Sequence, residues 1–413
     1  MSNRIIWGCI ADDYTGASDA ASFLAKGGLR TLLLNELPPH TPDLSACDAL
    51  VIGLKTRAMP PEEAVRQSLA ALDFLKSCGA EKIYVKYCST FDCTPKGNIG
   101  PVMDAMMEKL GARYTLLCPS LPVNGRTVQD GKLSVYGVPL HESPMKNHPL
   151  NPMWTDSLSD LMRPQSKLSC VAVANDMDDV SAEQRLTDVL AAHPESFYLV
   201  PDYATQEDGL RIARRFGSLP LLSGGSGLLE QLALCEQVGA EPIRFPGSAT
   251  QGLLLCGSCS AASARQIRAY EAAGGASIAI DPASIVNGSC TAAGVFSRLQ
   301  NNTLVYSVGA FRSAVENRPE HAQVLEQFMS ELTRLAAENG FRRLIVGGGE
   351  TSGAVVQALG FESFLVGQSV APGVPVLMPS GAPEYRLVLK SGNFGQEDFF
   401  LRAVSETSKG AAI

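Results

Sequence analysis

Short apolar runs alternate along the chain with longer segments in which apolar residues recur at helical spacing. In the first such pair, an apolar run at 4–11 stops at an acidic turn, and helical spacing of apolar residues follows over 16–27. The first pattern predicts a buried strand and the second an amphipathic helix. Strands that alternate with helices of this length predict an α/β fold with mainly parallel, doubly wound sheets.

The alternation continues to the end of the chain, with one connection near its middle that contains two Pro and two Gly, at 238–250. We therefore expect two doubly wound domains, at 1–240 and 250–413, with a cleft between them. Strands are expected at 4–11, 31–35, 49–54, 82–88, 114–119, 168–174, 196–202, 219–223, 252–257, 276–281, 303–309, 342–347, 363–367, 373–378 and 385–390. Helices are expected at 16–27, 61–77, 99–110, 181–192, 205–216, 225–237, 260–274, 318–339, 351–360 and 396–408.

One segment of the first domain, 120–165, interrupts this alternation. It is rich in Pro and has few periodic apolar residues. The pattern predicts a long irregular excursion, and excursions of this length in compact domains are commonly functional.

Composition narrows the partners that the chain can have. Its formal charge of -8 argues against nucleic acid, because no strongly basic face is implied. No apolar run reaches the roughly 18 residues of a membrane helix, and the N-terminal segment lacks the cleavage site of a signal peptide. We expect a cytoplasmic protein without a membrane partner, whose substrate is a small molecule. A homodimer and a monomer both fit the sequence.

The cysteines and histidines indicate no metal site. The 11 Cys residues are an odd number in mostly apolar surroundings, which is typical of thiols in a reducing compartment. Cys256 and Cys259 form a single CxxC without a second pair or a nearby His. The five His residues show no metal-ligand spacing.

Two adjacent acids, Asp12 and Asp13, follow the first predicted strand and precede the first predicted helix. In open α/β sheets, ligands bind at this edge, outside the carboxyl ends of the strands. A single acid, or Thr15, would serve as a helix cap. Two acids in a row repel each other unless a cation or a substrate hydroxyl interacts with them. The pair is therefore predicted to be catalytic or to bind a ligand, and the spacing does not say which acid has which role.

Basic residues follow three later strands of the first domain, namely Arg57, Lys86 and Arg126. Because parallel strands end at one edge of a sheet, these side chains are predicted to lie at the same rim as the two acids. Cations for a carboxylate, with acids for hydroxyl groups, suit a carboxylate-bearing polyol. The alternative is a set of scattered surface cations.

The second domain has three turns rich in Gly and Ser, each between a predicted strand and a predicted helix: 256–260, 347–353 and 390–395. Small residues let backbone N–H groups approach a phosphate, and a helix N-terminus favours the anion. One such turn would be weak evidence, but three in one domain favour nucleotide binding. Neither a P-loop nor a dinucleotide-binding GxGxxG motif occurs. A site for a carboxylate-bearing polyol and a nucleotide site in one chain predict phosphoryl transfer from the nucleotide with Mg²⁺, in which a carboxylate orients or deprotonates the attacking hydroxyl.

The sequence blocks that carry this chemistry also resemble a known family. They include IADDYTGASDAASFL, KYCSTFDCTPKGNIGPV, MKNHPLNPM, SGGSGL, GSCS, GGGETSGAVVQALG, APGVP and LKSGNFGQEDFF. Together they resemble the four-carbon acid sugar kinases, from the first strand to the last helix. The blocks MKNHPLNPM and LKSGNFG are specific, whereas DDYTG and GGGET alone would not be.

The resemblance implies an N-terminal domain that binds the acid sugar and a C-terminal domain that binds ATP. It also implies phosphorylation of the C4 hydroxyl of 3-oxo-tetronate, a 3-dehydro four-carbon sugar acid. By the resemblance, substrate contacts fall on the two acids and on Arg57, Lys86 and Ser89. The ATP contacts fall on Ser258, Gly348, Gly349, Glu350, Thr351 and Gly392.

Three alternatives stay open at this point. A kinase for D-threonate or D-erythronate would differ only at the C3 oxygen of its substrate. A nucleotide-dependent dehydrogenase of sugar acids is disfavoured by the missing GxGxxG motif. A non-catalytic sensor of sugar acids would not need both kinds of site. In the leading hypothesis, Asp12 or Asp13 is the catalytic base, and the other acid helps to hold substrate or metal.

Overall fold

The computed structural model describes residues 4–45, 47–91, 94–147, 151–175, 178–236, 238, 243–311 and 319–408. Contacts divide the chain into two compact units, Met1–Pro242 and Ile243–Ile413. Both are α/β, with mostly parallel sheets and a few antiparallel strands.

A five-stranded parallel sheet forms the centre of the first unit, in the order β11-β4-β1-β3-β2. Its middle strand is apolar and wholly buried, as a strand covered on both faces must be. From β1 the chain goes to the edge strand β2, returns to β3 beside β1 and then crosses to β4 on the other side, so β1 lies at the point where the strand order reverses. The strands are β1 (Trp7–Ala11), β2 (Thr31–Asn35), β3 (Ala49–Gly53), β4 (Lys82–Lys86) and β11 (Leu221–Gly224).

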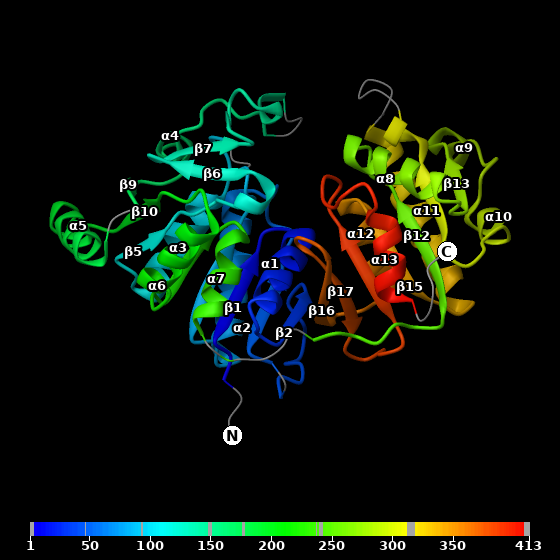
Figure 1. The fold of residues 1–413 in the computed structure, drawn as a ribbon, viewed down its shortest axis with the longest axis horizontal. Helices are drawn as coiled ribbons and strands as arrows, with labels where there is room; N and C mark the ends of the chain where they lie inside the picture. Colours follow the sequence, from blue (N-terminus) through cyan, green and yellow to red (C-terminus); the bar gives the residue numbers. More distant parts are fainter. Residues whose placement is uncertain are drawn as a thin grey trace. The chain divides into compact units, whose positions relative to one another are not determined.

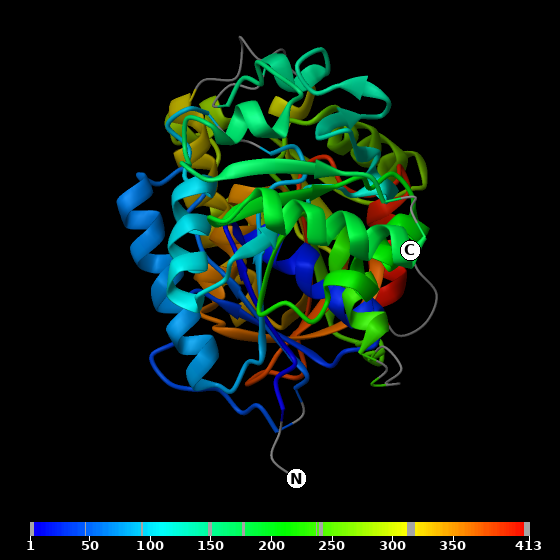
Figure 2. The same ribbon diagram turned by 90° about the vertical axis from the view of Figure 1, so that its left-hand side faces the viewer.

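Helices cover both faces of this sheet. On one face α1 packs on β1, β2 and β3 and against α7, and on the other α2 packs on β1 and against α3. Figure 2 shows the light-blue α2 and the cyan α3 side by side on one flank. The bounds are α1 (Tyr14–Lys26), α2 (Pro61–Ser77), α3 (Ile99–Leu110), α6 (Gln206–Phe216) and α7 (Gly227–Cys235). The predicted double winding is thus present in this sheet.

Three predicted strands of the first unit do not join that sheet. They form a separate parallel sheet in the order β5-β10-β9, made of β5 (Tyr114–Leu116), β10 (Phe197–Pro201) and β9 (Ser169–Val173), with α5 (Asp179–Ala192) nearby in the sequence. The sequence pattern did not predict that these strands form a sheet of their own. The local pattern predicts a strand, but which strands pair is a long-range property that the pattern does not contain.

The segment 120–165 is more regular than its composition predicts. It contains a small antiparallel sheet, β6-β7-β8, and three short helices. Hairpin turns with left-handed residues, such as Asp130 and Tyr136, allow these short strands to pair. The elements are η1 (Pro122–Asn124), β6 (Arg126–Gln129), β7 (Lys132–Val135), β8 (Val138–Pro139), η2 (Pro144–Asn147) and α4 (Leu158–Met162).

The second unit has a mixed sheet in the order β16-β17-β18-β15-β12-β14-β13. Its strands are parallel except at β17, which runs antiparallel to β16 and β18. Here the strand order reverses at β12, the first strand of the unit. The strands are β12 (Gln251–Cys256), β13 (Ser277–Ile280), β14 (Thr303–Ser307), β15 (Phe341–Gly347), β16 (Ser363–Ala371), β17 (Val374–Pro379) and β18 (Arg386–Lys390).

Helices also cover both faces of the second sheet (Figure 1). A buried core that includes Ile267, Tyr270, Phe399 and Phe400 joins α8 and α13 to one face, while α11 and α12 pack together on the other. The bounds are α8 (Ala261–Ala272), α9 (Pro282–Val286), α10 (Ala292–Phe296), η3 (Val308–Phe311), α11 (Pro319–Glu338), α12 (Gly349–Leu359) and α13 (Phe399–Thr407). The short α9 and α10 were not predicted.

Within the ranges that the structure describes, every cysteine is a free thiol, including Cys256 and Cys259. Among these same residues, no helix combines the length and the apolar character needed to cross a membrane.

Candidate functional site

The two adjacent acids lie directly beyond the carboxyl end of β1. Asp13 is the N-cap of α1, where its Oδ1 accepts the Gly16 N–H at 3.1 Å and its Oδ2 accepts the Thr15 hydroxyl at 2.9 Å. The backbone of Asp12 connects three strand ends, because its N–H donates to Lys86 and its carbonyl accepts from Arg57. The capping role and a ligand-binding role are therefore compatible at Asp13.

One guanidinium group explains how two acids can lie side by side. Arg57 donates from Nε and Nη2 to the two carboxylate oxygens of Asp12, at 2.9 and 2.7 Å, and from Nη2 to Asp13 at 2.7 Å. Asn98 holds the loop that carries Arg57, through hydrogen bonds to the carbonyls of Thr56 and Met59 at 2.6 and 3.0 Å. A planar guanidinium suits this geometry, because it presents several donors in a fixed fork.

A buried ammonium group completes the cluster. Lys86 ends β4, and its Nζ lies 3.8 Å from Asp13 and 3.9 Å from Asp19. Both separations are longer than a hydrogen bond. The side chain is only 6% exposed, and among the described residues its ammonium group has no hydrogen-bond acceptor.

The charges of the cluster set its protonation. Burial alone would raise the pKa of Asp13, but Arg57, Lys86 and the hydrogen bonds at the helix N-terminus outweigh burial, so the pKa lies below its usual value. For Lys86, burial lowers the pKa, and Asp13 and Asp19 more than reverse this, so the pKa is raised. Near neutral pH both groups are charged.

Asp19 is a member of this cluster that the sequence interpretation missed. It lies on the buried face of α1, accepts the Ser226 hydroxyl at 2.6 Å and has one oxygen, Oδ1, without a hydrogen-bond partner. Burial raises its pKa to about 6, against the opposing effects of Lys86 and Ser226. The sequence feature that could have identified Asp19 is an acidic residue among the alanines and serines of a predicted helix.

The other two predicted substrate residues, Ser89 and Arg126, make contacts with other residues of the first unit. Ser89 follows β4 and packs near Gly225, since a Cβ atom on that glycine would lie 3.4 Å from the Cβ of Ser89. Arg126 begins β6, where it donates to the Asn124 carbonyl and lies over the Tyr136 ring at 5.5 Å. The structure thus brings Arg57 and Lys86 to the acids and gives Arg126 contacts of its own.

In the second unit, the three Gly- and Ser-rich turns meet at the ends of β12, β15 and β18. The N–H of Ser258 donates to the Gly347 carbonyl at 3.3 Å, and the N–H of Gly348 donates to the Lys390 carbonyl at 2.9 Å. A Cβ atom on Gly392 would lie only 2.5 Å from the Ser258 hydroxyl. The predicted ATP contacts from three separate blocks are therefore neighbours.

Gly348 is the position at which this arrangement requires glycine. Its φ of 121° is a conformation that residues with a side chain rarely adopt, and a Cβ atom would lie 3.1 Å from the backbone nitrogen of Ser258. The residue caps α12, whose first turn carries Gly349, the exposed Glu350 and the buried Thr351. Free N–H groups at such a helix start, with no side chain in the way, form a phosphate-binding arrangement.

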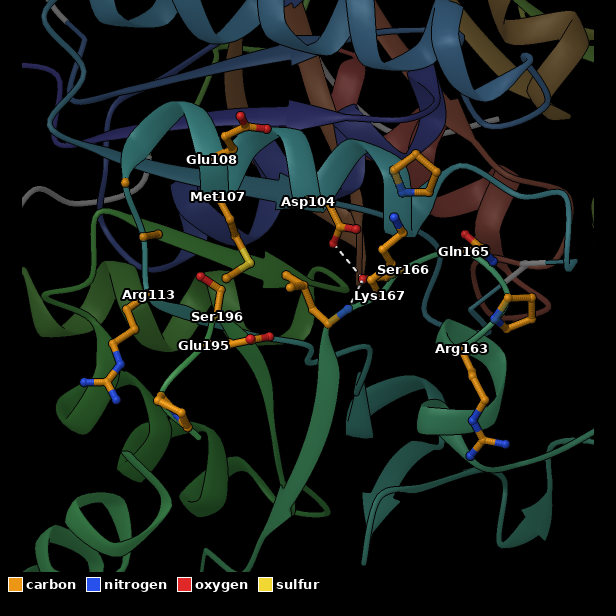
Figure 3. A pocket seen from close by; sticks show the side chains of 16 residues that line it. Asp104, Met107, Glu108, Arg113, Arg163, Gln165, Ser166, Lys167, Glu195 and Ser196 are labelled. Carbon is orange, nitrogen blue, oxygen red and sulfur yellow. Dashed lines mark hydrogen bonds between the residues drawn. The ribbon is translucent and has the colours of Figure 1, made fainter. Parts of the chain in front are cut away.

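A cavity of about 1000 Å³ in the first unit contains none of the predicted site residues. It lies between α3, the segment 163–168 and residues 194–196 (Figure 3). Asp104, which points into it, already accepts hydrogen bonds from Ser166 at 2.8 Å and from Tyr198. Both of these hydrogen bonds reach Oδ1, and because none of the predicted site residues lines the cavity, it is not part of the candidate site.

The sequence matches two domain families in the order that the two sites require. A sugar-binding N-terminal domain matches residues 7–232, and a nucleotide-binding C-terminal domain matches residues 253–400. The chain belongs to the four-carbon acid sugar kinase family. It is therefore a phosphotransferase, and the dehydrogenase and sensor alternatives lose their support.

Relatives of this kinase match it over nearly their full length. The 3-oxo-tetronate kinase of Salmonella typhimurium is 40% identical, covering 97% of this chain and 98% of the relative. The 3-oxo-tetronate kinase of Brucella melitensis is 38% identical, covering 96% and 94%.

Solved structures agree with the fold of this kinase. A crystal structure from Salmonella typhimurium, described there as a tRNA synthase, has a TM-score of 0.86 at 38% identity and covers 98% of this chain and 100% of its own. A Haemophilus influenzae protein has a TM-score of 0.80 at 37% identity, with 96% and 98% covered.

Proposed function

We propose that this kinase transfers the γ-phosphoryl group of ATP to the C4 hydroxyl of 3-oxo-tetronate, giving 3-oxo-tetronate 4-phosphate. The names of its relatives support the substrate. The observation that carries the proposal is the cluster at the end of β1, where two acids lie beside cations with unused donors.

Those unused donors suit the carboxylate of a sugar acid. The Nη1 of Arg57 and the Nζ of Lys86 make no hydrogen bond within the part of the chain that the structure describes. A bound carboxylate or ketone oxygen would satisfy both groups. Since charge-assisted hydrogen bonds are among the strong ones, the two cations would determine the orientation of the substrate.

Asp13 is the better placed of the two acids to accept the hydroxyl proton. Both oxygens of Asp12 accept from the Arg57 guanidinium, whereas the Oδ2 of Asp13 accepts only the neutral Thr15 hydroxyl. The side chain of Asp13 is also more exposed, at 27% against 15% for Asp12. In the proposed step, the C4 oxygen attacks the γ-phosphorus, the bond to the bridging oxygen of ADP breaks, and the hydroxyl proton passes to the Asp13 carboxylate. A carboxylate in this role mainly orients the hydroxyl, as in other phosphoryl transfers.

The turns of the second unit would hold the triphosphate through the backbone N–H groups of Gly349, Glu350 and Gly392, which donate to no other group within the described residues. Among the described residues, no group of three or more acidic, His or Cys side chains can hold a metal ion. Mg²⁺ commonly binds through substrate phosphates and one or two carboxylates, so we propose that it arrives with ATP and neutralises phosphate charge. Direct transfer also requires the two substrates to share one cleft, as we expect from the two-domain sequence.

An ADP-release assay with Mg-ATP tests the substrate on a panel of 3-oxo-tetronate, D-threonate, L-threonate and D-erythronate. Turnover on the keto acid alone would support the proposal and locate the discrimination at C3. Turnover on D-threonate or D-erythronate would instead make this chain a paralogous 4-kinase. That second candidate is compatible with the family match, which does not separate the two substrate classes.

A further inference from the structure

A buried cation lies beneath the three nucleotide turns. Lys390 ends β18 and has no exposed surface. Its ammonium group donates to the Ser263 hydroxyl at 3.0 Å and to the carbonyls of Ser391 and Gly392 at 3.2 and 3.0 Å. All of these partners are neutral.

The charge of Lys390 has no counterion in the protein. Among the described residues, no carboxylate lies within 4.0 Å of its ammonium group. The ring of Phe399 is 5.6 Å away, and the titratable neighbour is Cys256, whose thiol pKa is raised by burial. A buried charge without a partner costs folding free energy. Lys86 is also buried, but it lies between two acids.

The hydrogen bonds of Lys390 do not account for its charge. The Gly392 carbonyl also accepts the hydroxyl groups of Ser260 at 2.6 Å and Ser263 at 3.0 Å, and the Ser391 carbonyl accepts the Phe394 N–H at 3.1 Å. Without the ammonium group, both carbonyls would still have partners. A neutral side chain would therefore suffice if the position were only structural.

Lys390 lies directly beneath the Gly392 turn of the proposed nucleotide site. The Gly392 carbonyl accepts hydrogen bonds from Ser260, Ser263 and Lys390, which fix its direction. In a trans peptide the N–H of the next residue points the opposite way from the carbonyl, so the N–H of Asn393 is fixed as well. The same turn lies against Ser258. We propose that Lys390 is a positioning residue of the nucleotide site, which holds the Gly392 turn and supplies the positive charge that the phosphate groups of ATP require.

This inference rests on the proposed binding of ATP and is independent of the sugar acid. Burial lowers the pKa of Lys390 to about 8. Bound phosphates would favour the charged form and raise that pKa, so binding at a pH somewhat above 8 would take up a proton. Nucleotide affinity is expected to fall as the pH rises through about 8.

The test compares Lys390→Met with Arg386→Met, by calorimetric titration with ADP in the absence of sugar acid. Arg386 is a matched control, because it is a buried cation at the other end of β18 that donates only to carbonyls. We expect Lys390→Met to weaken ADP binding about tenfold or more, without lowering the melting temperature of the free protein. Arg386→Met should leave ADP affinity within about twofold.

Two results would overturn the proposal. One is ADP binding by Lys390→Met at wild-type affinity. The other is a loss of affinity that accompanies a lowered melting temperature, which is what a merely structural lysine would produce. A second measurement uses only the wild type. Calorimetric titrations with ADP in two buffers of different ionisation enthalpy should show that binding takes up protons near pH 8.5. Binding without proton uptake would contradict the role of Lys390. ADP binding without turnover on the sugar-acid panel would refute only the proposed substrate.

Discussion

The two proposed sites of this kinase are built in opposite ways. At the end of β1, side chains of both signs are paired with one another, as in the contact of Arg57 with Asp12 and Asp13. At the ends of β12, β15 and β18, the turns offer mainly backbone and hydroxyl groups, and the buried cation beneath them, Lys390, has neutral partners.

The difference corresponds to what each site has to recognise. A small sugar acid has one carboxylate and several hydroxyl groups at fixed positions, so donors and acceptors must be placed individually. A triphosphate has many equivalent oxygens, so closely spaced N–H groups and a positive potential are sufficient. Side-chain identity should therefore matter most in the first unit, and backbone conformation most in the second.

The largest effect is expected from Asp13→Asn. Asparagine caps a helix as well as aspartate does, so the substitution keeps the start of α1 and removes the proton acceptor. We expect kcat to fall by about a hundredfold or more, with little change in the KM for ATP.

Steady-state kinetics of Asp13→Asn and Asp12→Asn would check this expectation. Asp178→Asn is the control, because it makes the same substitution at another helix N-cap, that of α5. Turnover should not change in this variant. Unchanged turnover in both site variants would refute an acid in the proton-transfer role.

Gly348→Ala should give the next largest effect, this time through the backbone. The alanine would have to adopt a φ near 121° with its Cβ about 3.1 Å from the nitrogen of Ser258. We expect a rise of about tenfold in the KM for ATP, and no comparable change in the KM for the sugar acid.

Gly353→Ala serves as its control, because that helical glycine has open space where a Cβ atom would be placed. Equal effects of the two alanines would mean that helix α12, rather than the turn, sets the affinity.

The smallest effect is expected in the pH dependence of stability, from Asp19→Asn. The folded-state pKa of Asp19 is raised by burial to about 6, above the value of about 3.9 in an unfolded chain. Between these values the folded state binds the proton more tightly, so this group lowers the free energy of unfolding as the pH rises from about 4 to about 6.

Melting temperatures across that pH range would measure the effect. The variant should lose less stability than the wild type as the pH rises. An unchanged slope in Asp19→Asn would show that Asp19 does not titrate there.

Much of the fold and of the two proposed sites could be predicted, because these features depend on residues close together in the sequence. Alternating apolar patterns predicted nearly all of the longer strands and helices, and Asp12, Asp13 and the Gly-rich turns follow strands directly. The pairing of strands into separate sheets could not be predicted, because it depends on contacts between distant segments. Asp19 and Lys390 were missed for the same reason: their hydroxyl partners, Ser226 and Ser263, are 207 and 127 residues away.

The distance between Asp19 and Ser226 also constrains how the chain can fold during synthesis. Ser226 and the outer strand β11 come near the end of the first unit, so a nascent chain shorter than this leaves Asp19 without its hydroxyl and β4 without one neighbour. Contacts of such long sequence separation form slowly. The charged cluster at the end of β1 is therefore completed only after almost the whole first unit has left the ribosome, although its two adjacent acids emerge much earlier than Ser226.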